Sequence, residues 1–191
     1  VSTRWGRCKG AILMKYFDEL KRSMEWLGEK NKTVFIGQAV SFPGTAMSNT
    51  LKDIEKSKLI ELPVAEEFQM GMTLGLSLNG ITPVSIFPRW NFLICGMNQI
   101  VNHIDKINEM GASGFNSKII IRTGIGSERP LHPQHQHIGD FTTSISEMCK
   151  NIDFIKLSNP EDIFEGYKKA YEQRDVHATV LVEYGDYYNE K

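Results

Sequence analysis

The sequence predicts an α/β protein with a mostly parallel central sheet and helices on both faces. Three observations support this fold class. Short apolar runs alternate with amphipathic segments along the chain, the run KIIIRTG at 118–124 is apolar at nearly every position, and glycine or proline punctuates the connections. Continuous apolar runs suit strands buried on both faces, and strand–helix alternation at this spacing is typical of parallel sheets.

The first third of the chain is expected to contain a helix, two strands and a second helix. Residues 14–29 place apolar side chains three or four positions apart, which predicts a surface helix with one apolar stripe. The run TVFIGQAV at 33–40 predicts a buried strand that ends at Gly37. The Pro/Gly/Ser-rich stretch 41–49 predicts a loop, and a short helix at 49–56 leads to a strand near 58–62.

The middle of the chain continues the alternation. A helix is expected at 66–79, a strand at 82–87 and a long helix at 91–110, which the glycine-rich GASGFN should end. The strand at 118–124 is the clearest of all, because it is apolar on both faces. The stretch 125–140 is too polar and too rich in proline for a helix or a strand, so we expect a loop.

The last third completes the pattern with two helices and two strands. A helix is expected at 141–150 and a strand at 153–158. The next helix, at 160–173, begins with a proline in its first turn after Asn159, a favourable capping pair. The final strand is expected at 178–184.

Composition limits the classes of function that the chain can serve. Its 191 residues include 41% hydrophobic and 24% charged side chains, which is typical of a globular protein with one core. The formal net charge of −1 gives no electrostatic support for a nucleic-acid partner. No apolar run is long enough to cross a membrane, so no membrane partner is expected.

The cysteines and the first residues bear on location and boundaries. Cys8, Cys95 and Cys149 are odd in number, far apart and without a C-x-x-C pair. They suit a reducing compartment and a cytoplasmic protein better than a disulfide framework or a zinc site. Residues 1–13 lack an apolar region followed by a cleavage site, which argues against a secretory signal. Because Met14 can be the natural start, we expect residues 1–13 to be a leader or tag-like segment. Residues 14–191 are expected to form a single domain.

The loops that follow the strands are the places to look for chemistry, because ligands of parallel sheets bind at the carboxyl ends of the strands. Glu66 and Glu67 follow a strand and open a helix, where carboxylates also complement the helix dipole. Gly71 and Gly75 lie four apart on one face of that helix. They are expected to let another backbone, or a neighbouring subunit, come close.

Two further loops carry candidate groups, each with a structural alternative. FPRWNF at 87–92 can stack an aromatic ring on a planar ligand, or can cover the edge of the core. His132, His135 and His137 can bind metal, move protons or contact an anion, or lie in a solvated polar loop. RTGIGSER is not a dinucleotide-binding fingerprint, because Arg129 stands in place of its third glycine.

A specific order of features runs through PVAEEFQMGMTLGLSLNGITPVSIFPRWNFLICGMNQIVN, residues 63–102. A proline, a glutamate and two glycines four apart are followed by a strand, an aromatic-Asn-Phe element and a helix with Asn-Gln. PQHQH and a strand–helix–strand tail come later. From about Thr33 to Tyr184, this order resembles the pyrimidine-binding domain of thiamine-diphosphate enzymes. It is most similar to the beta subunits of pyruvate and branched-chain 2-oxoacid dehydrogenases.

The resemblance implies roles for individual residues. Glu66 stands at the position of the family's catalytic glutamate, which hydrogen-bonds the cofactor's pyrimidine ring and promotes deprotonation of the thiazolium carbon. Burial must keep such a carboxyl partly protonated by raising its pKa. Phe92 corresponds to the ring that stacks on the pyrimidine, and Trp90 is expected to flank the pocket. His135 matches the active-site histidine, with Gln134 beside it.

Other positions depart from the family pattern. Gln38 stands where the dehydrogenase subunits usually have a glutamate and is expected on the cofactor side. Arg89 is a candidate contact for a substrate carboxylate or phosphate, with Gln134 and His132 as further substrate contacts. The chain has no Gly-Asp-Gly motif and no metal ligands of its own are expected. The resemblance therefore implies that a partner chain holds Mg²⁺ and the diphosphate. On this resemblance we also expect residues 1–191 to lack the family's C-terminal domain.

Taken together, the resemblance implies the pyrimidine-binding subunit of a split thiamine-diphosphate enzyme that acts on a 2-oxoacid by decarboxylation and dehydrogenation. The expected partner is a diphosphate-binding, alpha-type subunit in a hetero-oligomer, with a homodimer as the isolated state. A transketolase-like two-carbon transfer from a ketose is the first alternative. A non-catalytic assembly partner and a metal-binding protein remain as alternatives of other classes.

Overall fold

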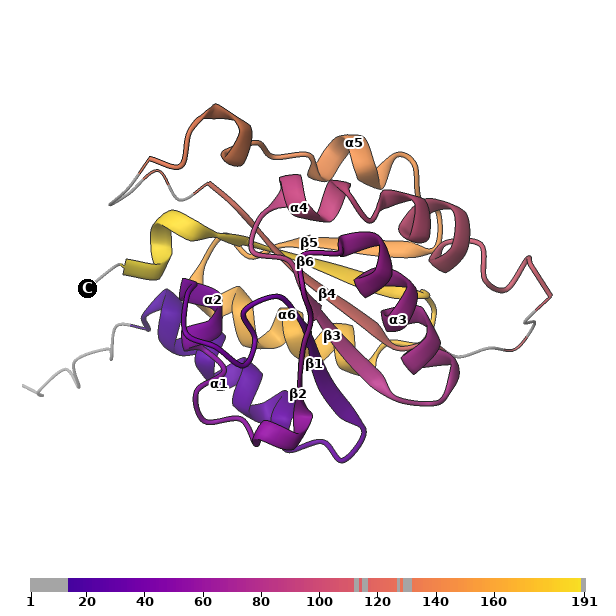
Figure 1. Cartoon of the computed structure of the whole chain (residues 1–191), viewed down its shortest axis with the longest axis horizontal. Helices are drawn as coiled ribbons and strands as arrows, with labels where there is room; N and C mark the ends of the chain where they lie inside the picture. Colours follow the sequence, from indigo (N-terminus) through magenta and orange to yellow (C-terminus); the bar gives the residue numbers. More distant parts are fainter. Residues whose placement is uncertain (1–13, 112–113, 115–116, 127, 129–131, 190–191) are drawn as a thin grey trace, which may run out of the picture.

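Six parallel strands form the central sheet of the computed structural model (Figure 1). The structure describes residues 14–111, 114, 117–126, 128 and 132–189, so the expectation for residues 1–13 lies outside it. The strand order is β2-β1-β3-β4-β6-β5, and every neighbouring pair is parallel. The strands are β1 (Thr33–Gly37), β2 (Leu59–Glu61), β3 (Thr82–Ile86), β4 (Ile119–Ile125), β5 (Ile152–Lys156) and β6 (Ala178–Tyr184). The predicted α/β class with a parallel sheet is confirmed.

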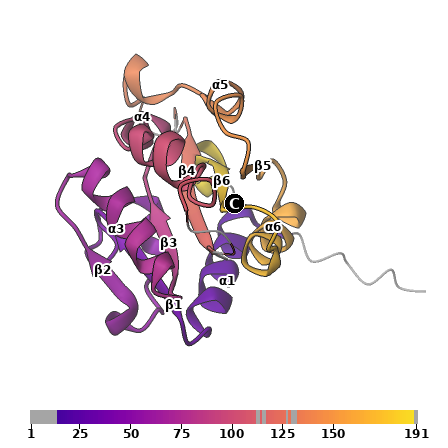
Figure 2. The same ribbon diagram turned by 90° about the vertical axis from the view of Figure 1, so that its right-hand side faces the viewer.

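Helices cover both faces of this sheet, as Figure 2 shows. α1 and α6 pack on one face, while α3, α4, η2 and α5 pack on the other. The helices are α1 (Tyr16–Gly28), α2 (Ala46–Asn49), α3 (Glu66–Leu78), α4 (Trp90–Ile94), α5 (Thr142–Ser146) and α6 (Pro160–Glu172). Shorter helical turns are η1 (Lys56–Lys58), the π-helical η2 (Gln99–Ile104), η3 (His135–His137) and η4 (Gly185–Asn189).

Each face of the sheet has its own hydrophobic core, and this explains the apolar strand sequences. Ile120 of β4 packs in the core under α1 and α6, whereas Ile119 and Ile121 pack in the opposite core. Side chains of successive strand residues point to opposite faces, so a strand covered on both sides is apolar at consecutive positions, as β4 is over residues 119–121. The run in β4 therefore follows directly from its central place in the sheet.

Tyr16 fastens the first helix to the last part of the chain. Its hydroxyl donates to the carbonyl of Leu157 at 2.7 Å and accepts from the backbone N–H of Tyr184 at 2.9 Å. The side chain is fully buried, and burial together with the Glu183 carboxylate raises the pKa of the Tyr16 hydroxyl far above its usual value. The hydroxyl therefore stays neutral and can both donate and accept.

A buried ion pair lies under the carboxyl end of the sheet. The Arg122 guanidinium of β4 donates from Nε to Glu183 Oε1 at 2.5 Å and from Nη2 to Oε2 at 3.0 Å. Its Nη1 donates to the Thr50 hydroxyl at 2.8 Å. The hydroxyls of Tyr167 and Tyr188 donate to the same carboxylate. The network thus joins β4 and β6 to α6, η4 and the residue that follows α2.

The segment around α2 differs from the sequence-based prediction. We expected a loop over 41–49 and a helix over 49–56, but the helix is α2 and residues 50–54 form turns. A capping box starts α2 early: the Thr45 hydroxyl accepts from the Ser48 N–H at 3.0 Å. The prediction was wrong because the T-x-x-S pattern was not considered as a helix start.

The long helix predicted over 91–110 is broken into α4, a turn and the π-helical η2. Gly96 lies at the break, where a Cβ would come within 2.8 Å of the Met70 side chain, so the chain passes tightly against α3. At the end of η2 the Asp105 carboxylate accepts from the N–H groups of Lys150 and Asn151 at 2.8 and 2.7 Å. Residues 150–151 are thus bound by Asp105 and are not part of a helix. α5 ends at Ser146, so it is shorter than the predicted helix at 141–150.

The remaining predicted elements match the structure within a few residues. β6 has the predicted bounds, and α6 begins at Pro160 as expected. Asn159 is the N-cap residue of α6, but its side chain donates to the Asp162 carboxylate at 2.9 Å and caps no backbone N–H. No helix in the described part of the chain is long and apolar enough to span a membrane.

Breaking the buried ion pair should destabilise the protein strongly. Glu183→Gln leaves the Arg122 charge buried without its carboxylate, and we expect the free energy of unfolding to fall by about 3–5 kcal/mol. Lys169→Met, which removes a surface ion pair with Asp153, should cost at most about 1 kcal/mol. Urea denaturation of both variants tests this. A Glu183→Gln cost as small as that of Lys169→Met would contradict it.

Candidate active site

The candidate residues gather at the carboxyl edge of the sheet, where the connections after β1, β2, β3 and β4 meet (Figure 1). Gln38 follows β1, and Glu66 begins α3 shortly after β2. Arg89, Trp90 and Phe92 lie in and after the connection from β3. The histidines follow β4. Parallel strands bring these four connections to one edge, as the sequence predicted.

Gln69 fixes α3 to the strand ends and so determines where Glu66 lies. Its buried side-chain amide donates to the Ser85 hydroxyl and the Ile86 carbonyl, both at 3.0 Å, and lies 3.3 Å from the Ile36 carbonyl. One helical turn further on, Thr73 donates to Ser85 at 3.0 Å. Glu66 is three residues before Gln69, so the amide network holds the first turn of α3 over the ends of β1 and β3.

Glu66 and two of the predicted cofactor contacts line one cleft, which we call the Glu66 cleft. Gln38, Glu66 and Phe92 form its wall together with backbone and side chains of residues 63–65, 69 and 86–88. Its free volume is about 10 Å³, room for roughly one water molecule. Glu66 and Phe92 are half-buried and Gln38 is exposed. A planar ring can therefore lie against this cleft but is not enclosed by this chain.

An open apolar groove, the α3 groove, lies beside the cleft and shares Glu66 with it. Phe68, Gly71, Met72, Cys95 and Gln99 line most of it, and its volume is about 840 Å³. Phe68 is 59% exposed. A Cβ on Gly71 would lie 3.9 Å from the Gln99 side chain, whereas a Cβ on Gly75 would meet no atom within 4 Å. This part of the α3 surface is unfilled in the single chain.

Glu67 has a structural role that differs from a simple match to the helix dipole. Its Oε1 accepts from Asn98 Nδ2 at 2.7 Å and from Gln99 Nε2 at 2.9 Å. These hydrogen bonds lower the pKa of the Glu67 carboxyl. Glu67 thus ties the start of α3 to the helix across the α3 groove, and its carboxylate is engaged there.

Arg89 holds the loop that carries the histidines, residues 132–140, against the sheet. We call this segment the histidine loop. The Nη1 atom of Arg89 donates to the Gly126 carbonyl at 2.6 Å and to the His137 carbonyl at 3.2 Å. Burial lowers the pKa of the guanidinium, which nonetheless stays charged. The loop thus docks on the segment after β3. Arg89 also lines a second cavity of about 230 Å³, which adjoins the Glu66 cleft at Pro88.

Within the histidine loop, His137 is the residue whose ring lies beside Phe92. Its ring lies 5.7 Å from that of Phe92, and its buried Nδ1 has no hydrogen-bond partner within the described residues. His132 and His135 are exposed and contact each other at 5.8 Å between ring centroids. Gln134 is also exposed, with φ of 73°. None of these last three residues lines the Glu66 cleft.

Trp90 lies in the core rather than in the wall of the cleft. Its side chain is 1% exposed and packs with Met70, Phe87 and Leu93, and its indole N–H has no partner among the described residues. We expected Phe92 to stack on the cofactor and Trp90 to flank the pocket. In the structure Phe92 lines the cleft, whereas Phe87, which also borders it, is 1% exposed and packs in the core with Trp90. Covering the core thus falls to Phe87 and Trp90, and stacking by Phe92 stays a prediction.

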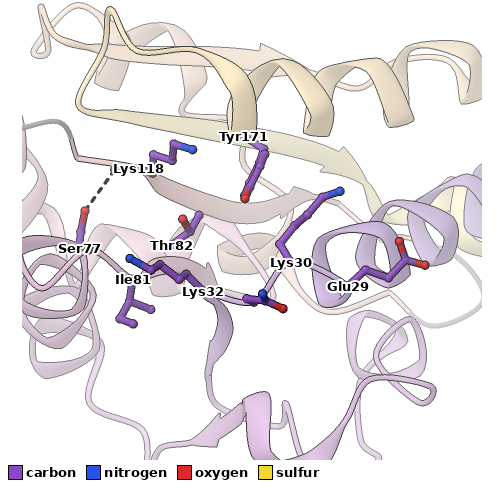
Figure 3. A pocket seen from close by; sticks show the side chains of 10 residues that line it. Glu29, Lys30, Lys32, Ser77, Ile81, Thr82, Lys118 and Tyr171 are labelled. Carbon is purple, nitrogen blue, oxygen red and sulfur yellow. Dashed lines mark hydrogen bonds between the residues drawn. The ribbon is translucent and has the colours of Figure 1, made fainter.

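A cavity of about 500 Å³ lies at the opposite, amino edge of the sheet (Figure 3). Lys30, Lys32 and Lys118 line it with Tyr171, and Lys118 lies 4.4 Å from the Tyr171 ring. Burial and the nearby Arg174 lower the pKa of Lys118. α1, α3 and α6 all end at this edge, and cations stabilise helix C-termini. The position of these lysines near helix C-termini accounts for their presence, and the cavity lies at the edge opposite the candidate active-site residues.

Sequence reasoning missed three residues that shape the site: Gln69, His137 and Glu61, whose contacts with the turn after β1 are described below. Gln69 lies on a helix whose apolar neighbours conceal it, and His137 was considered only as one of a cluster. Within the described residues, no group of three or more His, Cys, Asp or Glu is placed to hold a metal ion.

Comparison with known proteins identifies the family. Residues 16–188 match the family model described as "Transketolase, pyrimidine binding domain". The chain is 28% identical over 152 residues to a pyruvate dehydrogenase E1 component subunit beta of Staurastrum punctulatum, covering 77% of this chain and 45% of that protein. It is 23% identical over 157 residues to the 2-oxoisovalerate dehydrogenase subunit beta of Bacillus subtilis, covering 80% and 46%.

Solved structures agree on the fold. A "split gene transketolase, inactive beta4 tetramer" superposes with a TM-score of 0.67 at 17% identity, over 91% of this chain and 52% of that one. A putative thiamin diphosphate-dependent enzyme from Mycobacterium smegmatis gives 0.60 at 16%, over 93% and 31%. This chain spans about half the length of the curated relatives named above. With the family model matched over nearly all described residues, the chain belongs to the transketolase pyrimidine-binding domain family.

Proposed function

We propose that this chain is the pyrimidine-binding subunit of a split thiamine-diphosphate enzyme that decarboxylates a 2-oxoacid and passes on the acyl unit. The observation that carries the proposal is the meeting of the Glu66 carboxylate and the Phe92 ring in one cleft at the carboxyl edge of the sheet. Similarity to beta subunits of two 2-oxoacid dehydrogenases supports the substrate class.

The groups around the Glu66 cleft fit the pyrimidine half of the cofactor. A carboxyl can share a proton with a ring nitrogen, an aromatic face can stack on a planar ring, and the Gln38 amide can donate or accept. Thiamine diphosphate, when bound, supplies the carbon nucleophile that attacks the oxoacid. The chain would hold the pyrimidine ring between Phe92 and Glu66, while Trp90 supports the loop from the core.

Glu66 would act by holding a proton at its carboxyl against the ring nitrogen. This requires a dry surrounding, in which the neutral form of a carboxyl is favoured over the charged form. In the single chain Glu66 is half-buried and opens onto the α3 groove. A second chain that covers the groove would exclude water from Glu66, so the acid–base role and the shared active site are linked.

The partner would be a diphosphate-binding, alpha-type subunit that also holds Mg²⁺. The described residues offer no metal cluster, which leaves Mg²⁺ to the other chain in this proposal. The α3 groove is open, mostly apolar and carries the exposed Phe68, and Gly75 on the same helix has free space beside it, so this side of α3 suits a subunit contact. The α3 glycines would then allow close approach across a hetero-oligomer interface.

On the substrate side, His135 would serve in proton transfer, with Gln134 and His132 as neighbours in the same exposed loop. All three residues are exposed, which leaves them accessible to a ligand or a second subunit. Arg89 would act on the substrate mainly through this loop, because its Nη1 is engaged by two carbonyls. A ketose as substrate is the second candidate, favoured by the likeness in fold to a split transketolase.

Removing the acid of Glu66 should abolish turnover. In the assembled enzyme, Glu66→Gln cannot hold the proton at the ring, and we expect the rate of 2-oxoacid turnover to fall by about 10²–10⁴-fold. Glu165→Gln, an equivalent change on the exposed face of α6, should leave the rate unchanged. Steady-state assays with pyruvate, branched-chain 2-oxoacids and a ketose phosphate also separate the two candidate reactions. Full activity of Glu66→Gln would show that the assignment is incorrect.

Cofactor binding should depend on the second chain. We expect the isolated chain to show negligible affinity for thiamine diphosphate with Mg²⁺, and the complex purified through a tag on this chain to bind at least about 100-fold more tightly. Isothermal titration calorimetry measures both. Equal affinity in the two samples would refute the shared site.

Two surface variants test whether the α3 groove is the subunit interface. Phe68→Glu places a charge in the α3 groove and should weaken assembly, as measured by sedimentation velocity, because an unpaired charge is costly to bury. Met148→Glu changes a residue that is also exposed, at 54%, but lies outside the groove. It should assemble normally. Equal assembly of the two variants would exclude the groove as the interface.

A further inference from the structure

The turn after β1 is held by a single carboxylate from the neighbouring strand. Glu61, the last residue of β2, accepts three successive backbone N–H groups. Its Oε1 lies 2.6 Å from the Ala39 nitrogen, and its Oε2 lies 2.9 Å from that of Val40 and 2.7 Å from that of Ser41. Successive N–H groups that converge in this way form an anion-binding nest, which the chain here fills with its own side chain.

The backbone of this turn needs such support. Ala39 has φ of 56°, in the left-handed region that costs a residue with a Cβ roughly 1 kcal/mol or more. At Gly37, a Cβ would come within 2.5 Å of the Ile86 carbonyl oxygen, so β1 also passes very close to β3. Charge-assisted hydrogen bonds to a carboxylate are stronger than neutral ones, and three of them can outweigh the strain at Ala39.

The turn matters for the site because it begins with Gln38, which lines the Glu66 cleft. The five-residue segment from Glu61 to Ala65 leads directly to Glu66 at the start of α3. One short piece of chain therefore supplies both the carboxylate that fixes the Gln38 turn and the carboxylate that faces the cleft. A change in the turn moves Gln38 relative to Glu66.

We propose that Glu61 is a positioning residue, which holds the 38–41 turn so that the Gln38 side chain lies against the Glu66 cleft. This inference rests on the proposed function for its consequence in cofactor binding. Both carboxylate oxygens of Glu61 accept main-chain N–H groups of the turn, so in this proposal Glu61 acts through Gln38 rather than on a ligand. Its removal should affect affinity for the cofactor through the same step as the removal of Gln38.

The hold of Glu61 on the 38–41 turn is tested on the chain without any cofactor. In Glu61→Ala, we expect the amides of residues 39–41 to exchange with solvent at least about 10-fold faster, and the Gln38 side-chain amide signal in NMR spectra to shift. Formate should enter the empty nest and restore both readouts. Glu61→Gln, whose amide fills the nest without two carboxylate oxygens, should not be rescued. Glu29→Ala, an exposed carboxylate at the opposite edge, is the matched control and should change neither readout.

The link to the site is tested by a double-mutant cycle in the assembled enzyme. Glu61→Ala and Gln38→Ala should each weaken binding of thiamine diphosphate by about 10-fold, and the double variant should be no weaker than either one. Fully additive losses, or an unchanged Gln38 signal in Glu61→Ala, would overturn the proposal. If the wild-type complex binds no thiamine diphosphate, the proposed function fails, while exchange, the Gln38 signal and formate rescue still decide whether Glu61 positions the turn.

Discussion

The buried pair of Arg122 and Glu183 is the constraint on which the carboxyl half of this protein depends. Both side chains are inaccessible to solvent, so the cost of removing two charges from water is offset only by complete pairing and hydrogen bonding. Thr50, Tyr167 and Tyr188 supply the remaining partners. Burial alone would lower the pKa of Arg122, but the adjacent carboxylate raises it, and the guanidinium remains charged.

This network forms the base beneath the candidate site. Tyr188 and the neighbouring Gly124 line the cavity that adjoins the Glu66 cleft at Pro88. The packing is close there, since a Cβ on Gly124 would come within 3.3 Å of the Pro88 carbonyl oxygen and of the Met47 side chain. A change in the ion pair would therefore move the loops after β3 and β4 together.

Above this base, three polar side chains hold the main chain at the edge of the sheet. Gln69 binds carbonyls at the ends of β1 and β3, Glu61 binds N–H groups after β1, and Arg89 binds carbonyls at Gly126 and His137. All three side chains bind main-chain groups at the ends of strands or in the loops that follow them. The residues proposed to meet the ligand, such as Glu66 and Phe92, are thereby left free of such tasks.

The sequence predicted the fold well because the sheet is covered on both faces. An apolar run such as that of β4 has few interpretations, and strands alternating with helices allow few topologies. Predictions failed where a local tertiary contact decides the structure: at Gly96, where the chain passes α3, and at Asp105, which captures residues 150–151. Neither contact leaves a periodic signal.

For the site, the residue order predicted that Glu66, Phe92 and Gln38 lie at one edge. The resemblance singled out Phe92 as the ring at the cofactor, but it also placed beside the pocket Trp90, which lies in the core. Trp90 and Phe92 are two residues apart, and only packing sends the first into the core. His137 likewise stands two residues after His135, and the docking of the loop by Arg89 determines which ring meets Phe92. Roles for these residues in chemistry remain predictions.

The hydroxyl of Tyr16 has a consequence for biosynthesis. Its two partners, Leu157 and Tyr184, lie 141 and 168 positions after Tyr16 in the chain. These hydrogen bonds therefore cannot form until β5 and β6 have been made. Until then the apolar stripe of α1 lacks α6 and two of the six strands, which leaves it partly exposed during translation. Loop closure over such distances is slow, and nascent chains of this kind depend on protection from aggregation until the C-terminal strand has left the ribosome.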